Sequence, residues 1–527
     1  MTQRETAANE SEVMDVAAHR GREMVALPHP GTSVASSTAH FYIRAATIVA
    51  LVAFNFTDLV PGGKSRFLWN TCLLVSFVAV EVAWVRRREP RTWLLRPVVL
   101  ASVFTIALGF CISNASYVDS GSLAVARMYA ALGASAYAWM NRAMMFAVVA
   151  AMAMWVGYSV PLGRQLARVL WHGLHLSRWM RLGWELRWTT VALCLGVSVS
   201  ARLVQISLGI FGYSSQISSL YAASTYSAYL SVGADLSRLA LAAIALSYYG
   251  IGDRDPRTRT ILVVVFLYEL ILGGFLTGFK GQVVAPFAII GAAYYITARR
   301  VSYPMVAGAL MALAIGYVVI EPFRRARFLD PNFESSNIAY IASTMMAQAD
   351  SVDAGTAPNM LMDQYLPQLQ GSTSMVLETA KAIQYADQVG LSRNSPRFLR
   401  DLLMSPAYAV VPRFMWPDKP LQNLGNWYAN EVWGENTTTN ARAMGPLGYL
   451  YFAGGGGVIF LGFLAIGILQ RCADTMFGDF RVAGGMIVYL GLLSPLVLID
   501  SAFYTIFVTI LRTFPFLILA QWALFRR

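Results

Sequence analysis

Charged side chains are scarce in this 527-residue sequence. Asp, Glu, Lys and Arg together make up 13% of the chain, whereas 56% of its residues are hydrophobic. A globular protein of this composition would be insoluble in water, so the sequence indicates a polytopic membrane protein. The net charge of +12 does not indicate nucleic-acid binding, because most of the excess lies in short breaks between apolar blocks. The positive-inside rule accounts for positive charge in such breaks.

Cysteine and histidine are scarce too. The four cysteines lie in or beside apolar segments, which argues against a disulfide framework or a cysteine-based metal cluster. The five histidines all precede residue 176, so none falls in the long polar interruption at 322–445. The sequence also lacks the HExxH, Walker A and GxSxG motifs of zinc proteases, P-loop ATPases and serine hydrolases.

Apolar blocks long enough to cross a bilayer of about 30 Å follow a polar start. Residues 1–42 are rich in Ser, Thr and Ala, which predicts a disordered cytosolic tail and no cleavable signal peptide. A shallow outer helix is predicted at 122–138, with Asn141-Arg142 dividing this region from the next crossing. About twelve crossings are expected, at 44–60, 66–85, 95–114, 143–160, 189–210, 225–250, 260–279, 282–298, 303–321, 446–470, 483–500 and 503–525.

Basic breaks orient these crossings. Residues 86–91, 252–259 and 298–300 are rich in arginine, and the positive-inside rule places such breaks in the cytosol. Residues 161–188 carry five arginines among Trp and Leu residues, a pattern typical of a basic amphipathic helix on the cytosolic surface. Counting crossings from these breaks places both termini in the cytosol and the interruption at 322–445 on the outer face.

The outer interruption is predicted to fold into short helices. Val376, Ala380 and Ile383 recur at helical spacing, and so do Ile338 and Ile341. Prolines divide the segment into pieces. Because a long structured insertion often carries binding and catalytic residues, we expect the functional site in this region.

Three arginines at the outer end of a crossing are the first candidate site residues. Arg324, Arg325 and Arg327 lie where the positive-inside rule disfavours them. Guanidinium groups bind phosphate and pyrophosphate with two parallel hydrogen bonds, so this cluster predicts an anionic partner. The alternative is that the arginines reach lipid phosphates and only anchor the helix.

Lys280 is the second candidate. It lies in a tight turn on the same face, and Gly278 and Gly281 would let a phosphate approach the backbone closely. The alternative is an ordinary lysine at the membrane interface.

A proline-bounded aromatic segment closes the interruption. Residues 412–420 read Pro-Arg-Phe-Met-Trp-Pro-Asp-Lys-Pro, and the prolines lower the cost of holding Arg413 in place. Aromatic side chains such as Trp416 stack on sugars or lie at membrane interfaces. The alternative is a loop on the membrane surface in which Arg413 pairs with Asp418. The candidate substrate-binding residues are Trp416, Asp418, Lys419 and Arg442.

Charged residues inside the crossings are costly in lipid, so they are expected to be functional or paired. Arg202, Asp235, Arg238 and Glu269 are of this kind. Asp235 and Arg238 are three residues apart on one helix, which predicts an ion pair.

The order of these features resembles a known family. A Gly-basic-Gly turn opens one crossing, a later crossing ends in arginines, and the proline-bounded motif precedes a re-entry rich in Gly, Tyr and Phe at 445–454. This order resembles the oligosaccharide repeat-unit polymerases of bacterial polysaccharide export (O-antigen polymerases, Wzy-type), which share a fold with the O-antigen ligases. The likeness covers about residues 276–457. Lys280 stands where the family usually has the arginine of a Gly-Ser-Arg-Gly turn.

The resemblance implies an all-α polytopic glycosyltransferase with a GT-C-like fold in the bacterial inner membrane. Such an enzyme joins undecaprenyl-pyrophosphate-linked oligosaccharide repeat units on the periplasmic face, by inverting transfer that needs no metal or other cofactor. Its product would be O-antigen, capsule or exopolysaccharide, and a chain-length regulator and a flippase would be its partners.

The resemblance also implies roles for the candidate residues. Lys280 and the three arginines at 324, 325 and 327 would hold the pyrophosphate leaving group, while Arg413 with Trp416 would order the sugars. A general base is expected, and the sequence does not choose among Asp330, Glu334, Asp418 and Glu431.

Two other functions are weighed against the polymerase. An O-antigen ligase uses an outer-loop histidine in its family, and this chain has none at 322–445. A lipid-linked oligosaccharide flippase or other transporter should carry its charges along a central cavity, whereas here they concentrate at the outer face. The polymerase is therefore the preferred interpretation.

Overall fold

Helices are the regular elements of the part of the chain that the computed structural model describes, and a single isolated β-bridge joins Leu186 and Phe525 there. The predicted tail at 1–42 lies outside this part except for its last residues. The described residues are 38–57, 60, 62–181, 183–212, 226–250, 255–329, 337–350, 374–411, 415–416, 419, 424–436, 442–478, 482–499 and 503–526.

Helices before residue 210 form the first group. They are α2 (Thr38–Phe56), α3 (Gly63–Arg88), η1 (Trp93–Leu95), α4 (Pro97–Ala101), η2 (Ser102–Ala107), α5 (Leu108–Phe110), η3 (Ile112–Tyr117), α6 (Leu123–Leu132), α7 (Ala136–Ser159), α8 (Leu162–Gly173), α9 (Leu176–Trp179) and α10 (Trp188–Ser207). The predicted amphipathic segment at 161–188 therefore contains two short helices, α8 and α9.

Helices after residue 226 complete the chain. Those before the polar interruption are α12 (Ser227–Gly250), α13 (Pro256–Tyr268), η5 (Glu269–Gly274), η6 (Phe275–Thr277), α14 (Lys280–Ala298) and α15 (Tyr303–Leu329). Those within it are α16 (Ile338–Asp350), α19 (Met375–Val389), α20 (Leu391–Leu403), α21 (Ser405–Val410), α22 (Leu424–Trp427) and η8 (Tyr428–Val432). Those after it are α23 (Gly445–Phe477), α24 (Ala483–Val497) and α25 (Phe503–Leu524).

Nine helices in the described part are long and apolar enough to cross a membrane, which supports the prediction of an all-α membrane protein. Three shorter apolar helices, Tyr42–Phe56, Tyr303–Gly316 and Ala483–Val497, coincide with the remaining predicted crossings. The nine are Gly63–Arg88, Pro97–Tyr117, Ala136–Ser159, Trp188–Ser207, Tyr229–Gly250, Pro256–Thr277, Gly281–Ala298, Gly445–Phe477 and Phe503–Leu524.

One predicted boundary is wrong. Helix α7 runs unbroken through Asn141, and the chain instead breaks at Gly133, which has a φ of 74° that glycine adopts without steric cost. Asn141 is accommodated because it bonds to two other helices. The Asn70 amide donates to Asn141 Oδ1 at 2.7 Å, and the Asn141 amide donates to Asn55 Oδ1 at 2.8 Å. A buried polar side chain with satisfied hydrogen bonds costs little.

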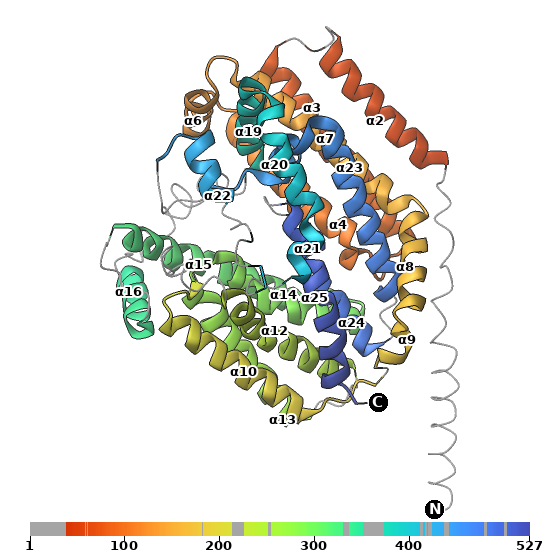
Figure 1. The fold of residues 1–527 in the computed structure, drawn as a ribbon, viewed down its shortest axis with the longest axis vertical. Coiled ribbons are helices and arrows are strands. Elements are labelled where there is room, and N and C mark those ends of the chain that lie inside the picture. Colours follow the sequence, from red (N-terminus) through yellow and green to blue (C-terminus); the bar gives the residue numbers. More distant parts are fainter. Residues whose placement is uncertain are drawn as a thin grey trace, which may run out of the picture.

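Two apolar clusters hold the helices together (Figure 1). One gathers residues of α3, α7, α19 and the first part of α23. The other gathers residues of α12, α13, α14 and α24. The long helix α23 contributes residues to both clusters, such as Ile459 to the first and Cys472 to the second. It therefore joins the helices of the first cluster to those of the second.

Several arginine-rich breaks lie close together at one end of these helices, the basic end. Arg96, which follows the break at 86–91, forms a salt bridge with Asp474 near the end of α23. The Arg187 amide donates to the Leu524 carbonyl at 2.8 Å, and the Arg526 amide donates to the Glu185 carbonyl at 2.9 Å. The starts of α3, α7 and α23 lie at the opposite end, which carries helices of the polar interruption.

Candidate functional site

The turn that holds Lys280 packs against the helix that ends in arginines. Leu276 of η6 lies in one apolar cluster with Phe323 of α15 and Ile341 of α16. Phe323 directly precedes Arg324, and Leu276 lies four residues before Lys280. The sequence predicts these two cationic positions as phosphate ligands from separate features, and the fold brings their backbones together.

A buried charge network lies just before this turn. Glu269 is 1% exposed and accepts hydrogen bonds from Arg202 at 2.7 Å, from Arg238 at 3.2 Å and from the Ser237 hydroxyl. Arg238 also pairs with Asp235 at 3.1 Å, which confirms that predicted ion pair. Buried charges of this kind are kept only where they are paired and hydrogen-bonded. The network therefore ties α10 and α12 to the start of η5.

The backbone after Glu269 leaves α-helical geometry. Residues Glu269–Gly274 form a π-helix and Phe275–Thr277 a 3₁₀-helix. Gly278 then has a φ of 71°, in the left-handed region that favours glycine. Irregular turns of this kind inside helices often occur at functional sites. Among the described residues, none lies within 4 Å of a Cβ placed at Gly281, so these residues leave room for an anion beside this glycine.

Arg442 lies at the centre of a cluster of charged and aromatic side chains within the polar interruption. Its guanidinium donates to Glu378 at 3.0 Å and also to Glu435. It stacks over the Trp433 ring, 3.9 Å from the centroid. The Trp433 indole donates to the other Glu378 oxygen at 2.9 Å, and the Tyr428 hydroxyl donates to the Glu378 carbonyl at 2.6 Å. The cluster is thus a rigid surface of one arginine, one indole and two carboxylates.

Burial changes the proton affinities of this cluster. It raises the pKa of the Glu378 carboxyl, and the charge of Arg442 opposes that shift. It also lowers the pKa of the nearby Lys381 ammonium, which donates to the Ala131 carbonyl at 2.9 Å. Both residues are therefore less readily charged than they would be in water.

Glu431 is the one general-base candidate that lies among the described residues. Its carboxylate is exposed on η8 and accepts a hydrogen bond from the Tyr385 hydroxyl at 2.9 Å. An exposed carboxylate is accessible to an acceptor hydroxyl, and its catalytic role stays a prediction.

Three residues of the proline-bounded segment are described, Met415, Trp416 and Lys419. The Trp416 ring packs on the Tyr408 ring, with centroids 5.7 Å apart. Lys419 is buried, and its ammonium donates to the carbonyls of Tyr408 at 2.7 Å and Val411 at 3.1 Å. These carbonyls end α21, where a lysine commonly caps a helix. Lys419 thus holds the segment in place, and its predicted contact with substrate stays a prediction.

The other predicted site residues are described only in part or not at all. Four are placed by their backbone alone, because their side chains lie outside the described residues: Lys280, Arg324, Arg325 and Arg327. Four more lie wholly outside the described residues: Arg413, Asp418, Asp330 and Glu334. Their predicted roles stay predictions.

A kink in α23 makes room for contact with helix α20. Gly454 and Gly455 have non-helical backbone angles, and the φ of 74° at Gly455 favours glycine. The kink frees the Ala453 carbonyl, which accepts a hydrogen bond from the Ser395 hydroxyl of α20 at 2.8 Å. The glycine run therefore serves the bend that sets α20 against the membrane helices.

Sequence reasoning missed the partners that fix Arg442 and Tyr451. Glu378 lies on the face of α19 opposite the apolar stripe that predicts this helix, where a carboxylate is ordinary, so no signal in the sequence indicated its role. Asp387 of α19 accepts hydrogen bonds from Tyr451 at 2.7 Å and from Arg142 of α7. No local pattern links these residues, because their partners come from distant parts of the chain.

Potential metal ligands do not cluster in the described residues, and one protein family matches the chain. Within the described ranges, no group of three or more His, Cys, Asp or Glu could hold a metal ion. One protein-family model, described as a domain of unknown function (DUF8712), matches residues 197–525. No curated protein and no solved structure matches the chain. The matched region begins within α10 and ends after α25, so it contains the Lys280 turn, the end of α15 and the Arg442 cluster.

Proposed function

The chain belongs to the family described as a domain of unknown function (DUF8712), and we propose a function for it from its own residues. It joins undecaprenyl-pyrophosphate-linked oligosaccharide repeat units into O-antigen, capsule or exopolysaccharide. The proposal places the reaction on the periplasmic face of the bacterial inner membrane, in a GT-C-like arrangement of about twelve crossings with both termini in the cytosol.

The contact between the Lys280 turn and the end of α15 carries this proposal. Leu276 and Phe323 share one apolar cluster, so up to four cationic residues gather within a short stretch of two adjacent helices. Pyrophosphate carries several negative charges, and a cluster of guanidinium and ammonium groups can neutralise them. Lipid anchoring alone would not require cations from two separate helices.

The reaction divides between the cationic residues at the Lys280 turn and the end of α15, and the charged and aromatic cluster around Arg442. The acceptor hydroxyl of the incoming unit attacks the anomeric carbon of the growing chain, and its proton passes to a carboxylate such as Glu431. The bond between that carbon and the pyrophosphate oxygen breaks as the new glycosidic bond forms. Arginines 324, 325 and 327 stabilise the charge that develops on the leaving pyrophosphate, while Trp416, Trp433 and Arg442 offer stacking and hydrogen-bonding surfaces to the sugars.

Reporter fusions test the orientation on which this mechanism depends. Reporters fused after Arg88, Arg257 and Arg300 should report the cytosol, because those breaks are basic. Fusions after Gly371 and Ser395 should report the periplasm. A cytosolic reporter at Gly371 would contradict the mechanism, since the polymer has to be built outside.

Chelation tests whether cationic side chains replace a metal ion. We expect polymerisation by the purified protein to survive EDTA, because arginine and lysine neutralise the leaving group in the proposed mechanism. The measurement is product length with and without chelator. Loss of activity that a divalent ion restores would overturn this part of the proposal.

A further inference from the structure

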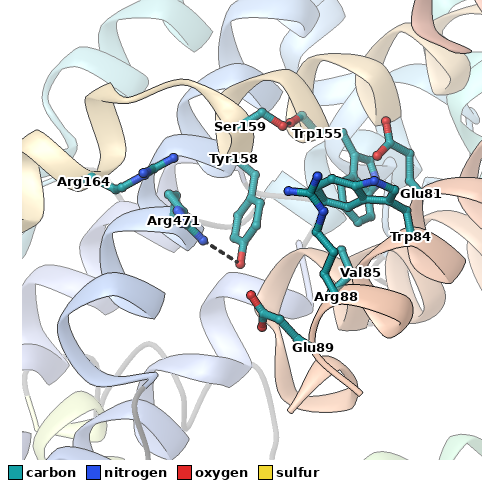
Figure 2. Close-up of a pocket in the computed structure, with 10 residues that line it drawn as sticks. All are labelled: Glu81, Trp84, Val85, Arg88, Glu89, Trp155, Tyr158, Ser159, Arg164 and Arg471. Carbon is teal, nitrogen blue, oxygen red and sulfur yellow. Dashed lines mark hydrogen bonds between the residues drawn. The ribbon is translucent and has the colours of Figure 1, made fainter. Parts of the chain in front are cut away.

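A small cavity lies at the basic end of the helices, far along the chain from the proposed catalytic residues. Its volume is about 30 Å³, which is room for about two water molecules. Side chains of α3, α7, α8 and α23 line it (Figure 2). Figure 2 shows Arg88 on one side of the Tyr158 ring and Arg164 with Arg471 on the other.

The carboxylates that line this cavity are already neutralised. Glu81 forms a salt bridge with Arg44 at 2.9 Å, and Glu89 forms one with Arg96 at 2.5 Å. Neither Arg44 nor Arg96 belongs to the cavity lining. The positive charges of the lining arginines are therefore not balanced by these two acids.

Arg164 is the clearest unbalanced charge. Among the described residues it has no ion pair, and its buried Nε has no hydrogen-bond partner. Burial and the positive charges of Arg471 and Arg168 lower its pKa. A buried hydrogen-bond donor without an acceptor costs free energy. The surroundings of Arg164 therefore favour the binding of an anionic ligand.

Two further arginines complete the cationic lining. Arg88 stacks over the Trp84 ring, 4.1 Å from the centroid, and has no ion pair among the described residues. The Arg471 side chain reaches Tyr158 and Asp474, but its buried Nε also lacks a hydrogen-bond partner. The Ser159 hydroxyl is already engaged, because it donates to the Trp155 carbonyl at 2.7 Å and accepts from Arg44 at 2.9 Å.

We propose that this cavity binds the phosphate group of an anionic membrane lipid. Arginine forks match phosphate oxygens. Basic pockets between membrane helices at the cytosolic side are typical sites for anionic headgroups. The partly exposed Trp84 indole lies beside Arg88, as expected at a membrane interface. The site is independent of the proposed polymerase chemistry, which takes place at the other end of the helices.

Lipid titration of the purified full-length protein tests this site. The ligands are short-chain phosphatidylglycerol, phosphatidylcholine of the same chain length, and inorganic phosphate. Phosphatidylglycerol should bind more tightly than phosphatidylcholine. Arg164→Gln should weaken phosphatidylglycerol binding by about 10-fold or more, because a hydrogen bond to a charged group contributes about 1.5–3 kcal/mol. Arg88→Gln, on α3, should weaken it as well.

Arg168→Gln is the matched control. Arg168 lies one turn further along α8, is exposed and does not line the cavity. Its substitution therefore removes one positive charge, as Arg164→Gln does, but leaves the cavity lining unchanged. We expect less than a twofold change in affinity for this variant. In the absence of lipid, the unfolding midpoint of Arg164→Gln should equal or exceed that of the wild type. The substitution removes a positive charge that is repelled by neighbouring positive charges.

Comparison of the lipids with inorganic phosphate shows whether the cavity recognises the phosphate group alone or the whole lipid. Competition by inorganic phosphate would support a site for the phosphate group itself, and lipid binding without competition would support a site that also needs the membrane-bound part of the lipid. Equal loss of affinity in Arg164→Gln and Arg168→Gln would show a diffuse surface effect and overturn the proposal. Unchanged lipid binding in both Arg164→Gln and Arg88→Gln would also overturn it.

Discussion

Replacing Arg324, Arg325 or Arg327 with alanine is expected to abolish polymer while the protein stays at normal abundance in the membrane. Each arginine that holds pyrophosphate contributes a charge-assisted contact of about 2–3 kcal/mol. Its loss slows the reaction by about two orders of magnitude. The arginine-to-lysine variant should recover little activity at a position that binds with two parallel hydrogen bonds, because an ammonium keeps the charge but not the planar fork.

Accumulation of lipid-linked single repeat units is the measurement for these variants, in a strain whose pathway is otherwise intact. Arg413→Ala should give a similar loss. Arg393→Ala is the matched control, because Arg393 is an exposed arginine on α20 of the same outer region and should be near neutral. If all four site variants made full-length polymer, the catalytic assignment would be wrong and the cluster would be an anchor to lipid phosphates.

Replacing Glu269 with leucine is expected to destabilise the protein strongly. The change leaves Arg202, which is 6% exposed, and Arg238 without their shared buried carboxylate. Removal of one partner from a buried ion pair costs about 3–5 kcal/mol. The unfolding midpoint of the purified protein should therefore fall, and so should its abundance in the membrane.

Asp235→Asn is the control for this network. Asp235 contacts the same Arg238, but its side chain is 61% exposed and Arg238 keeps its bond to Glu269. The expected cost is within about 1 kcal/mol. The double variant Arg202→Met with Glu269→Leu should recover part of the lost stability, because an apolar pair replaces the broken ion pair. A Glu269→Leu protein as stable as the wild type would show that the network does not hold these helices.

Local patterns predicted the parts of the fold that depend on neighbouring residues. The helical spacing of Val376, Ala380 and Ile383 predicts α19, and the structure buries all three on one face. The three-residue spacing of Asp235 and Arg238 predicts their ion pair. In each case the pattern that predicts the structure lies within one helix, so it can be recognised from the spacing of residues in the sequence.

Contacts between distant segments account for what the sequence could not predict. Asn141 was expected to divide a shallow helix from the next crossing, yet α7 runs through it, and Asn55 and Asn70 satisfy its amide from two other helices. Arg442 was predicted as a substrate ligand, and its bonds to Glu378 come from a helix more than sixty residues away. Pairings of this kind depend on how helices pack, which no local spacing reveals.

Reconstitution tests the central claim most directly. The purified chain is placed in lipid vesicles with undecaprenyl-pyrophosphate-linked repeat units of its own pathway, without other enzymes. The account predicts a ladder of longer glycans and the release of one undecaprenyl pyrophosphate for each new linkage, both lost in Arg324→Ala. Movement of intact units across the bilayer without any new linkage, or no glycan longer than one unit from a folded protein, would contradict it.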